Sequence, residues 1–252
     1  MITLGVACKP KYSAPDLNSG TANFDRFVMV GDGHSAGYMD DALYHEGQKS
    51  GLAVLLAKQF ELLGGEVFST RFVSENSVGA NASGQSRLIL GNSQDCNGVV
   101  SLAPIRKANI GDLNIVTVST FSGEAQYRNL SVPGMGVLRA ISPNYAQFNP
   151  FYARFASSSS SSVLEDAVSL NPTFFGVYLG IEDVMGYARS GGLIDNMPEP
   201  LDFSVAYNQV VQSLVAGGAR GFVATIPDVR SMPFFRTVPY DGLNIQDQSD
   251  VN

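Results

Sequence analysis

The sequence predicts an α/β fold with a doubly wound parallel sheet that is flanked by helices on both faces. Short apolar runs that end at glycine are typical of strands covered on both sides, and they alternate with amphipathic segments of helical period. Such a strand–helix–strand alternation favours a parallel sheet with right-handed crossovers. The composition agrees, because 26 glycines, 44% hydrophobic residues and 15% charged residues are typical of a loop-rich α/β protein and not of a helical bundle.

The first buried strand is expected at Phe27–Val30, a continuous apolar run. The following Gly31-Asp32-Gly33 predicts a sharp turn, and the small residues Ser35, Ala36 and Gly37 allow the next segment to pack closely. Open α/β sheets carry their chemistry at the carboxyl ends of the strands. We therefore expect the functional site at this turn.

Two long amphipathic helices are expected. The first runs from Glu46 to Leu63 and ends at Gly64-Gly65, and the second runs from Asp202 to Ala216 and ends at Gly217-Gly218. The residues expected on their buried faces are Leu52, Leu55, Leu56, Phe60 and Leu63 in the first helix and Val205, Val210, Val211 and Leu214 in the second.

Three further runs are expected to be strands. Ile115–Val118 is β-branched, and Thr173–Gly180 and Gly221–Ile226 are apolar enough for buried strands. The stretch 66–114 is rich in Ser, Asn and Gly, with Arg87–Leu90 as its candidate strand. We interpret Gly91-Asn92-Ser93 as a loop and not as a nucleophile turn, because no small residues follow it.

The middle of the chain carries an aromatic cluster and a serine run. Phe148–Phe155 is interpreted as core, with the lining of an acyl or aryl pocket as the alternative. Ser157–Ser162 is expected to be flexible because of its composition. Ser162 and Glu165 predict a capping box for a helix that runs to Leu170.

The turn at Gly31-Asp32-Gly33-His34-Ser35-Ala36-Gly37 resembles the first block of the SGNH/GDSL hydrolases, a family of esterases and lipases. The segment Gly37–Tyr44, followed by Glu46-Gly47-Gln48, is similar to a Bacteroidetes lipoprotein branch of that family. The resemblance implies a flavodoxin-like three-layer fold with an insertion over residues 66–114, and acyl-ester hydrolysis with neither metal nor cofactor. The family's nucleophilic serine corresponds to Gly33, which has no side chain.

Two later segments resemble further blocks of the family. Asn129–Gly136 is similar to the second block, which implies that the backbone N–H of Gly134 helps to bind an oxyanion. Asn171–Gly192 is similar to the Gly-x-Asn-Asp block, with Glu182 in place of the asparagine and Asp183 after it. An ionised glutamate only accepts hydrogen bonds and would repel an oxyanion, whereas a protonated Glu182 in an apolar site would donate.

The family's late Asp-x-x-His block, which supplies the general base, is missing, since no histidine follows His45. The chain is therefore either a fragment of a longer protein or has lost the block. Ser35 with its neighbour His34 is a weak substitute, because adjacent side chains usually diverge. Asp32 and Asp183 complete the candidate site, and Asp183 defaults to a capping role when no histidine is assigned to it.

The N-terminus resembles the end of a bacterial lipoprotein signal. Met1–Ala7 is an apolar run before Cys8, which predicts lipidation at Cys8 with residues 9–23 as a tether. The domain then spans residues 24–240 and is followed by a polar tail at 241–252. The net charge of −7 argues against nucleic acid as a partner, and two histidines with two cysteines are too few for a zinc site of their own.

Two functional hypotheses follow. In the first, a catalytically impaired hydrolase fold acts as a scaffold or binding subunit, lipid-anchored at the outer membrane or cell surface, with a membrane protein complex as partner and an acyl ester or glycan as ligand. In the second, the protein is an active serine esterase or lipase in a longer or parent form, or through Ser35. A separate variant of this second hypothesis takes Gly33 as an engineered or misread position in an active parent esterase.

Overall fold

The computed structural model describes residues 17–117, 121–193 and 197–236, so Cys8 and the polar tail lie outside the described residues. The strands are β1 (Phe27–Gly31), β2 (Leu88–Gln94), β3 (Val100–Arg106), β4 (Asn129–Ser131), β5 (Phe174–Tyr178) and β6 (Arg220–Val223). The α-helices are α1 (Gly33–Ala36), α2 (His45–Lys49), α3 (Leu52–Glu61), α4 (Val137–Ala140), α5 (Pro150–Ala153), α6 (Val163–Ser169), α7 (Ile181–Arg189), α8 (Pro200–Ala216) and α9 (Pro233–Arg236). Three 3₁₀ helices are η1 (Leu113–Ile115), η2 (Tyr145–Gln147) and η3 (Val229–Ser231).

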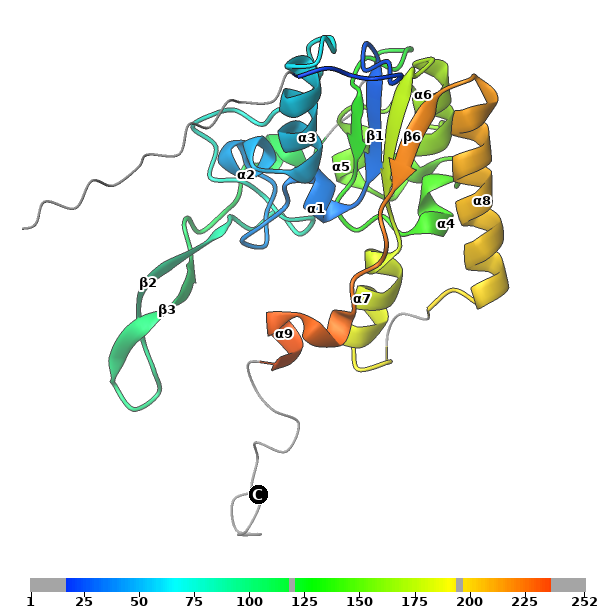
Figure 1. Cartoon of the computed structure of the whole chain (residues 1–252). Helices are drawn as coiled ribbons and strands as arrows, with labels where there is room; N and C mark the ends of the chain where they lie inside the picture. Colours follow the sequence, from blue (N-terminus) through cyan, green and yellow to red (C-terminus); the bar gives the residue numbers. More distant parts are fainter. Residues whose placement is uncertain (1–16, 118–120, 194–196, 237–252) are drawn as a thin grey trace, which may run out of the picture.

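Four strands form a parallel sheet in the order β4-β1-β5-β6 (Figure 1). The chain places β4 on one side of β1 and then returns to place β5 and β6 on the other side. The strand order therefore reverses between β1 and β5, which is the point where open α/β sheets bind ligands at their carboxyl edge.

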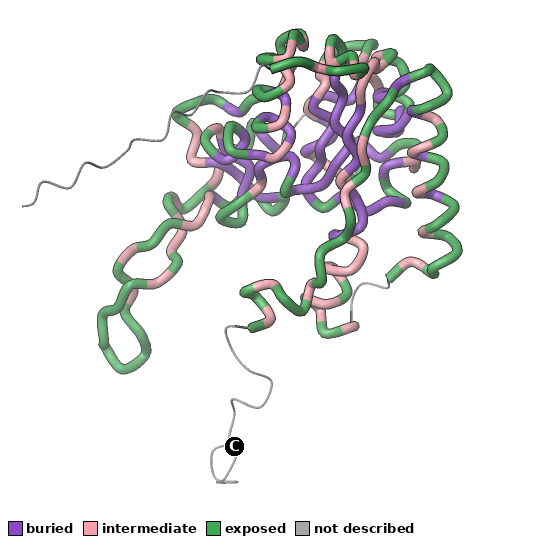
Figure 2. Tube along the Cα trace, in the orientation of Figure 1, coloured by how far each residue is buried: buried purple, intermediate pink, exposed green. Residues whose placement is uncertain are grey.

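Helices cover both faces of this sheet. Alternate residues of β1 point to opposite faces, so Val28 and Val30 join the large core while Phe27 and Met29 join the small one. The large core contains α6 and α8 and the small one contains Ala53 and Ala57 of α3, and Figure 2 shows the buried segments gathered at the sheet between them. The prediction of a parallel sheet flanked by helices is therefore confirmed.

Two of the predicted strands differ from the structure. β6 is an exposed edge strand and not a buried one, since Val223 keeps 51% of its surface exposed. The run Ile115–Val118 does not form a strand in its described part: Ile115 ends η1, and Val118 lies outside the described residues. The run is apolar because Ile115 is buried in the core and not because the run pairs in a sheet.

The first predicted helix is divided into α2 and α3 at Ser50-Gly51. Gly51 has an extended ψ of 146°, and a Cβ there would lie 2.7 Å from the backbone N of Gly37, so only glycine fits this crossing. The buried face of α3 also differs from the expected one. Ala53, Val54 and Ala57 are buried whereas Leu55 is 48% exposed, because α3 packs closely enough on the sheet to favour small side chains.

The loop-rich stretch contains an antiparallel hairpin, β2–β3, that projects from the body of the protein (Figure 1). The predicted strand at Arg87–Leu90 is therefore confirmed in part. Gly91-Asn92-Ser93 lies in the middle of β2 and pairs with Ser101–Ala103, so it is a strand and not a loop. Neither face of this hairpin packs on the core, so its strands do not require alternating apolar and polar residues.

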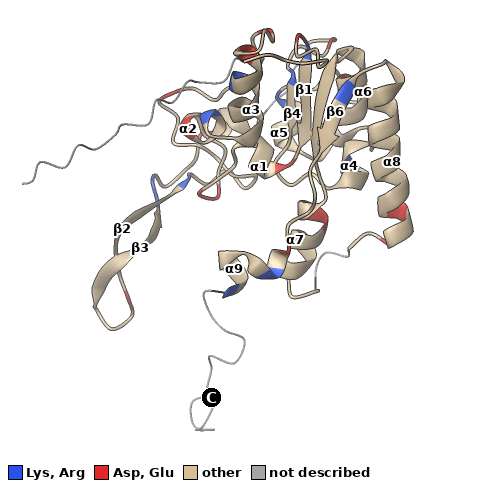
Figure 3. Cartoon of the chain, viewed as in Figure 1, with Lys and Arg blue, Asp and Glu red and all other residues tan. Residues whose placement is uncertain are grey.

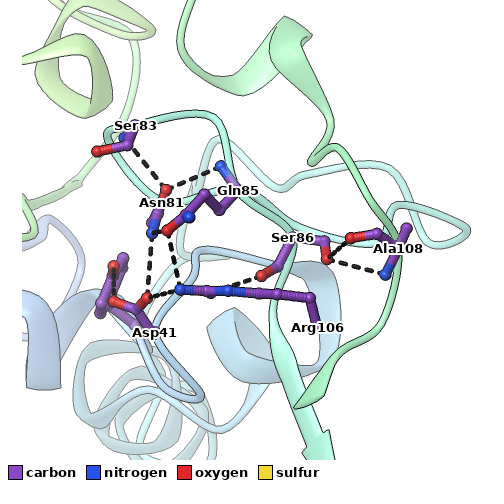
Figure 4. A network of polar contacts seen from close by, with 8 residues as sticks. Asp41, Asn81, Ser83, Gln85, Ser86, Arg106 and Ala108 are labelled. Carbon is purple, nitrogen blue, oxygen red and sulfur yellow. Dashed lines mark hydrogen bonds and ion pairs between the residues drawn. The ribbon is translucent and has the colours of Figure 1, made fainter.

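A polar network fixes the base of the hairpin (Figure 4). The Asp41 carboxylate accepts hydrogen bonds from Arg106 at 2.6 Å, Asn81 at 3.0 Å and Tyr38 at 3.1 Å, and Arg106 also donates to Gln85 at 2.9 Å. Burial alone would raise the pKa of the Asp41 carboxyl, but these donors, led by Arg106, outweigh burial and lower it. The network therefore links the hairpin to the loop that carries Tyr38.

The serine run is ordered by Asp166, contrary to the prediction of flexibility. The buried Asp166 carboxylate accepts hydrogen bonds from the backbone N–H of Ser157 at 3.0 Å, the hydroxyl of Ser157 at 2.5 Å and the hydroxyl of Tyr152 at 2.7 Å. The predicted capping box is confirmed, since Ser162 and Glu165 bond each other's backbone N–H groups at the start of α6. Composition predicted a flexible linker because it carries no information about a distant buried acceptor.

Substitution Asp166→Ala should lower the free energy of unfolding by about 2–4 kcal/mol, because it leaves several buried donors without an acceptor. Urea unfolding followed by circular dichroism measures the change. Glu124→Ala, at an exposed acidic residue whose carboxylate accepts no hydrogen bond from a described residue, is the matched control and should change stability by no more than about 0.5 kcal/mol. Equal losses in the two variants would contradict the role of Asp166.

Candidate functional site

The candidate site lies where the carboxyl ends of β1 and β5 meet, at the reversal of strand order. β1 leads into α1 through Asp32, and β5 leads into α7 through Leu179 and Gly180. The backbone N–H of Asp32 donates to the carbonyl of Tyr178 at 3.2 Å, so the two turns are held side by side.

Gly33 lies at the meeting point of the three segments that resemble the family's blocks. A Cβ built on Gly33 would lie 3.8 Å from Oε1 of Glu182, 3.8 Å from the Cα of Pro133 and 3.5 Å from the Cβ of Tyr38. These are ordinary van der Waals distances, so a small side chain would fit at this position. The structure thus brings together Gly33, Glu182 and the Pro133-Gly134 turn, which are far apart in the sequence.

Gly134 has a left-handed backbone, with φ of +77°, and its Cβ position is open. Within the part of the chain that the structure describes, the backbone N–H groups of Gly33 and Gly134 donate no hydrogen bond to protein atoms. Both donors are therefore unpaired within the described residues, and Gly134 is exposed whereas Gly33 is buried.

Asp32 and His34 form a pair at the start of α1. Asp32 is fully buried, and its Oδ1 accepts the backbone N–H of His34 at 2.9 Å as the helix N-cap. Nδ1 of His34 lies 3.6 Å from the same oxygen, and the His34 side chain is 54% exposed. The interaction of the imidazole with the Asp32 carboxylate outweighs burial and raises the pKa of His34. Oδ2 of Asp32 has no hydrogen-bond partner among the described residues.

Ser35 points away from His34 and into the protein. It is fully buried, and its hydroxyl makes no hydrogen bond with any described residue. A Cβ at Gly31 would lie 2.4 Å from the Ser35 hydroxyl, so Ser35 packs against the backbone of β1, next to Ser131. This arrangement disfavours Ser35 as a nucleophile, because neither a base nor a substrate reaches it.

Glu182 lies in the first turn of α7 and faces Gly33 with Oε1, while its Oε2 accepts a hydrogen bond from Arg189 at 3.1 Å. Burial raises the pKa of the Glu182 carboxyl, the nearby Arg189 opposes the shift, and the negative charge of Asp32 adds to it. The sequence analysis missed Arg189. Its position seven residues after Glu182, two helical turns on the same face, was the signal available for finding it.

Asp183 has the capping role expected of it in the absence of a histidine partner. Both carboxylate oxygens accept the backbone N–H of Val137 at the start of α4, at 3.1 Å and 2.9 Å. A Cβ at Gly136 would lie 2.4 Å from Oδ1 of Asp183, so this contact requires glycine. Burial raises the pKa of the Asp183 carboxyl, and the Val137 hydrogen bond opposes the shift.

A groove of about 560 Å³ extends from Gly134 and Glu182 between α4 and α7. Its lining is mostly polar or glycine and consists of Gly134, Gly136, Leu138, Arg139, Ser142, Glu182, Asp183, Gly186, Arg189 and Pro198. The aromatic cluster does not line it, because Phe151, Tyr152 and Phe155 are buried in the large core. The interpretation of that cluster as core is confirmed for these three rings.

A larger cleft of about 680 Å³ lies at the opposite end of the strands and is lined by Arg26 and Arg220. Both arginines already donate to backbone carbonyls, Arg26 to Asn171 at 2.7 Å and Arg220 to Thr21 at 3.1 Å. We take the groove that begins at Gly134 and Glu182 as the candidate site instead. This groove lies at the carboxyl edge of the sheet, and its lining includes the charged side chains of Glu182 and Arg189.

The second histidine lies away from the site. Nδ1 of His45 is 2.8 Å from the carbonyl of Val73, and its Nε2 faces Glu75. In the described ranges, no three His, Cys, Asp or Glu side chains are grouped closely enough to hold a metal ion. No helix among the described residues has the length and apolarity required to span a bilayer.

Comparisons with protein-family models, curated proteins and solved structures find no match to this chain. The class of fold, an α/β fold with a parallel sheet flanked by helices, is therefore defined by the structure.

The Asp32–His34 pair predicts a pH-dependent signal. In an NMR titration, the pKa of His34 should lie above its ordinary value of about 6.5, and it should fall in Asp32→Asn, which keeps a good N-cap but removes the charge. Because the pKa of His34 is raised in the folded state, the protonated imidazole contributes to the free energy of unfolding. This contribution is complete below pH ~6.5 and is lost as the pH rises through the raised pKa. His45, which contacts Val73 and Glu75, is the internal reference. An unchanged His34 titration in Asp32→Asn would exclude this origin of the shift.

Proposed function

We propose that the protein is an SGNH/GDSL-hydrolase-like lipoprotein whose hydrolytic site is impaired and which acts as a binding subunit at the outer membrane. One observation carries the proposal: the glycine at the family's nucleophile position directs its empty Cβ position toward Glu182 and the Pro133-Gly134 turn. The convergence of the three family-like segments at the strand-order reversal supports the family, and the missing side chain supports the loss of serine chemistry.

The histidines and Glu182 also argue against serine-ester hydrolysis. Serine-ester hydrolysis requires a nucleophile and a base in mutual reach, and Gly33 supplies no hydroxyl. Among the described residues, neither histidine is hydrogen-bonded to a serine hydroxyl, since His34 faces Asp32 and His45 faces Val73. Glu182 adds negative charge where an oxyanion would form, and removal of one oxyanion donor already costs roughly 100- to 1,000-fold in rate.

A glycan is the ligand class that the groove supports better than an acyl chain. Arg139, Ser142 and Glu182 present charged and hydroxyl groups, and Leu138 and Pro198 are the only aliphatic side chains among the described lining residues. An acyl chain is bound through an apolar wall that removes its surface from water. Sugar hydroxyls both donate and accept hydrogen bonds, and they therefore match a wall of carboxylates and guanidinium groups.

The second candidate is an active serine esterase in a parent form with serine at position 33. It is favoured by the space at Gly33, where a Cβ would meet nothing closer than 3.5 Å. Serine would therefore fit there without displacing the neighbouring backbone.

Turnover of p-nitrophenyl acetate and butyrate tests these proposals. The unaltered protein should hydrolyse both esters at the buffer rate, because no nucleophile is presented. Activity that appears only in Gly33→Ser would favour the second candidate. Hydrolysis by the unaltered protein that disappears in Ser35→Ala would refute the impaired site.

The lipoprotein part of the proposal rests on the resemblance of residues 1–8 to a lipoprotein signal. In cells that process lipoproteins, we expect the protein in the membrane fraction, with labelled fatty acid attached at Cys8. Cys8→Ser should release it from the membrane. Recovery of unlabelled protein with an intact Met1 would contradict the anchor, and copurified membrane proteins would support the role as a subunit.

A further inference from the structure

A small cavity of about 10 Å³ is lined by residues of β4, of α5 and its C-terminal end, and of the loop that precedes β2. Arg71 and Arg154 both line this cavity, and no acidic residue is among its described lining residues. Leu43, Phe151 and Phe155 contribute apolar walls. A cavity of this size holds one guest about as large as a water molecule. The cavity is therefore positively charged and has room for a single small guest.

Arg154 carries a charge that no described carboxylate neutralises. Its side chain is partly buried, and of its guanidinium donors only Nη2 is bonded to a described residue, the backbone carbonyl of Arg71 at 3.0 Å. Burial lowers the pKa of Arg154 to about 10, and the positive charge of Arg71 adds to this shift. Asp112 opposes the shift, but its carboxylate forms no ion pair with Arg154 and accepts from Ser77 instead. An unneutralised charge in such surroundings is costly, and an anion beside it removes part of that cost.

Arg71 adds a second positive charge at the same cavity. Its Nη1 donates to the hydroxyl of Tyr127 at 3.0 Å, and its guanidinium carbon lies 5.8 Å from the centroid of that ring. Both contacts are with a neutral group, and no carboxylate among the described residues forms an ion pair with Arg71. Two like charges therefore line the cavity, and an anion inside it would be attracted by both of them.

The neutral polar groups of the cavity add further donors. The hydroxyls of Thr70 and Ser131 are buried and make no hydrogen bond with any described residue. Asn129 lies on the same face of β4 as Ser131, because the two residues are separated by one position in a strand. Its Oδ1 accepts the backbone N–H of Ser131 at 3.2 Å, whereas its Nδ2 has no partner among the described residues. The lining therefore presents hydroxyl, amide and guanidinium donors without a carboxylate among them.

We propose that this cavity binds one small monovalent anion, with chloride as its occupant. Arg154 supplies the charge, and the hydroxyls of Thr70 and Ser131 and the Nδ2 of Asn129 supply hydrogen bonds. An anion only accepts, as these donors require, whereas a water molecule would also have to donate. The cavity is too small for sulfate or phosphate. It shares no lining residue with the groove between α4 and α7, so the inference goes beyond the proposed function and does not depend on it.

The chloride dependence of thermal unfolding tests the site. At constant ionic strength, replacing sodium gluconate by about 0.3 M sodium chloride should raise the melting temperature of the unaltered chain by about 4 °C, because the anion binds only the folded state. Arg154→Met removes the charge and should reduce this shift to less than about 1 °C. Ser131→Ala is a milder change, and it should raise the chloride concentration at the half-maximal shift by about threefold or more.

Arg230→Met is the matched control. It removes the same charge from a side chain that is 87% exposed, is paired with Asp228 and does not line the cavity, so it should keep the full chloride shift. An equal chloride shift in Arg154→Met and the unaltered protein would overturn the site.

Bromide in crystals of the unaltered protein gives a second measurement that does not require any variant to fold. An anomalous bromide peak in the cavity beside Arg154, together with the chloride dependence in solution, would support the site. A cavity that holds only water, or stays empty in bromide, would overturn it. A bromide peak without any chloride dependence in solution would mark an adventitious ion only and would also overturn the proposal.

Discussion

Close backbone contacts under the carboxyl end of β1 are the constraint on which the rest of the site depends. A Cβ at Gly37 would lie 2.2 Å from the carbonyl of Gly47, and one at Gly31 would lie 2.4 Å from the Ser35 hydroxyl. The first contact holds α2 against the end of α1, and the second holds α1 against β1, as only glycine permits. The position of Gly33, and of every group that faces it, follows from this packing.

The groups around Gly33 combine unpaired backbone N–H donors with a carboxylate. Gly33 and Gly134 offer unpaired backbone donors, as an oxyanion site requires, but Glu182 faces the same space with a carboxylate. Arg189 offsets part of this charge and also fixes its orientation. The carboxylate opposes the stabilisation of a developing negative charge, which is why we propose binding and not hydrolysis at this site.

Several elements of the fold were predictable because their causes are local. The buried strands β1 and β5 follow from apolar runs, and the start of α6 follows from the capping box at Ser162. The errors arose where distant residues decide the outcome: Asp166 orders the serine run, and the edge position leaves β6 exposed. The turns of the candidate site were predictable, and so was Arg189 from its helical spacing after Glu182, whereas Tyr38 became visible only once the loop before α2 was placed against Gly33.

The sequence by itself determined that the protein has a parallel α/β sheet and that its first turn carries no side chain at Gly33, because strand pattern and residue identity are properties of the chain alone. Only the tertiary structure decided that Ser35 is buried under β1, that Asp183 caps α4 and that Glu182 faces the empty position. Those outcomes depend on which segments meet at the reversal of strand order. Contacts between residues as far apart in the sequence as Gly33 and Glu182 leave no local pattern from which they can be predicted.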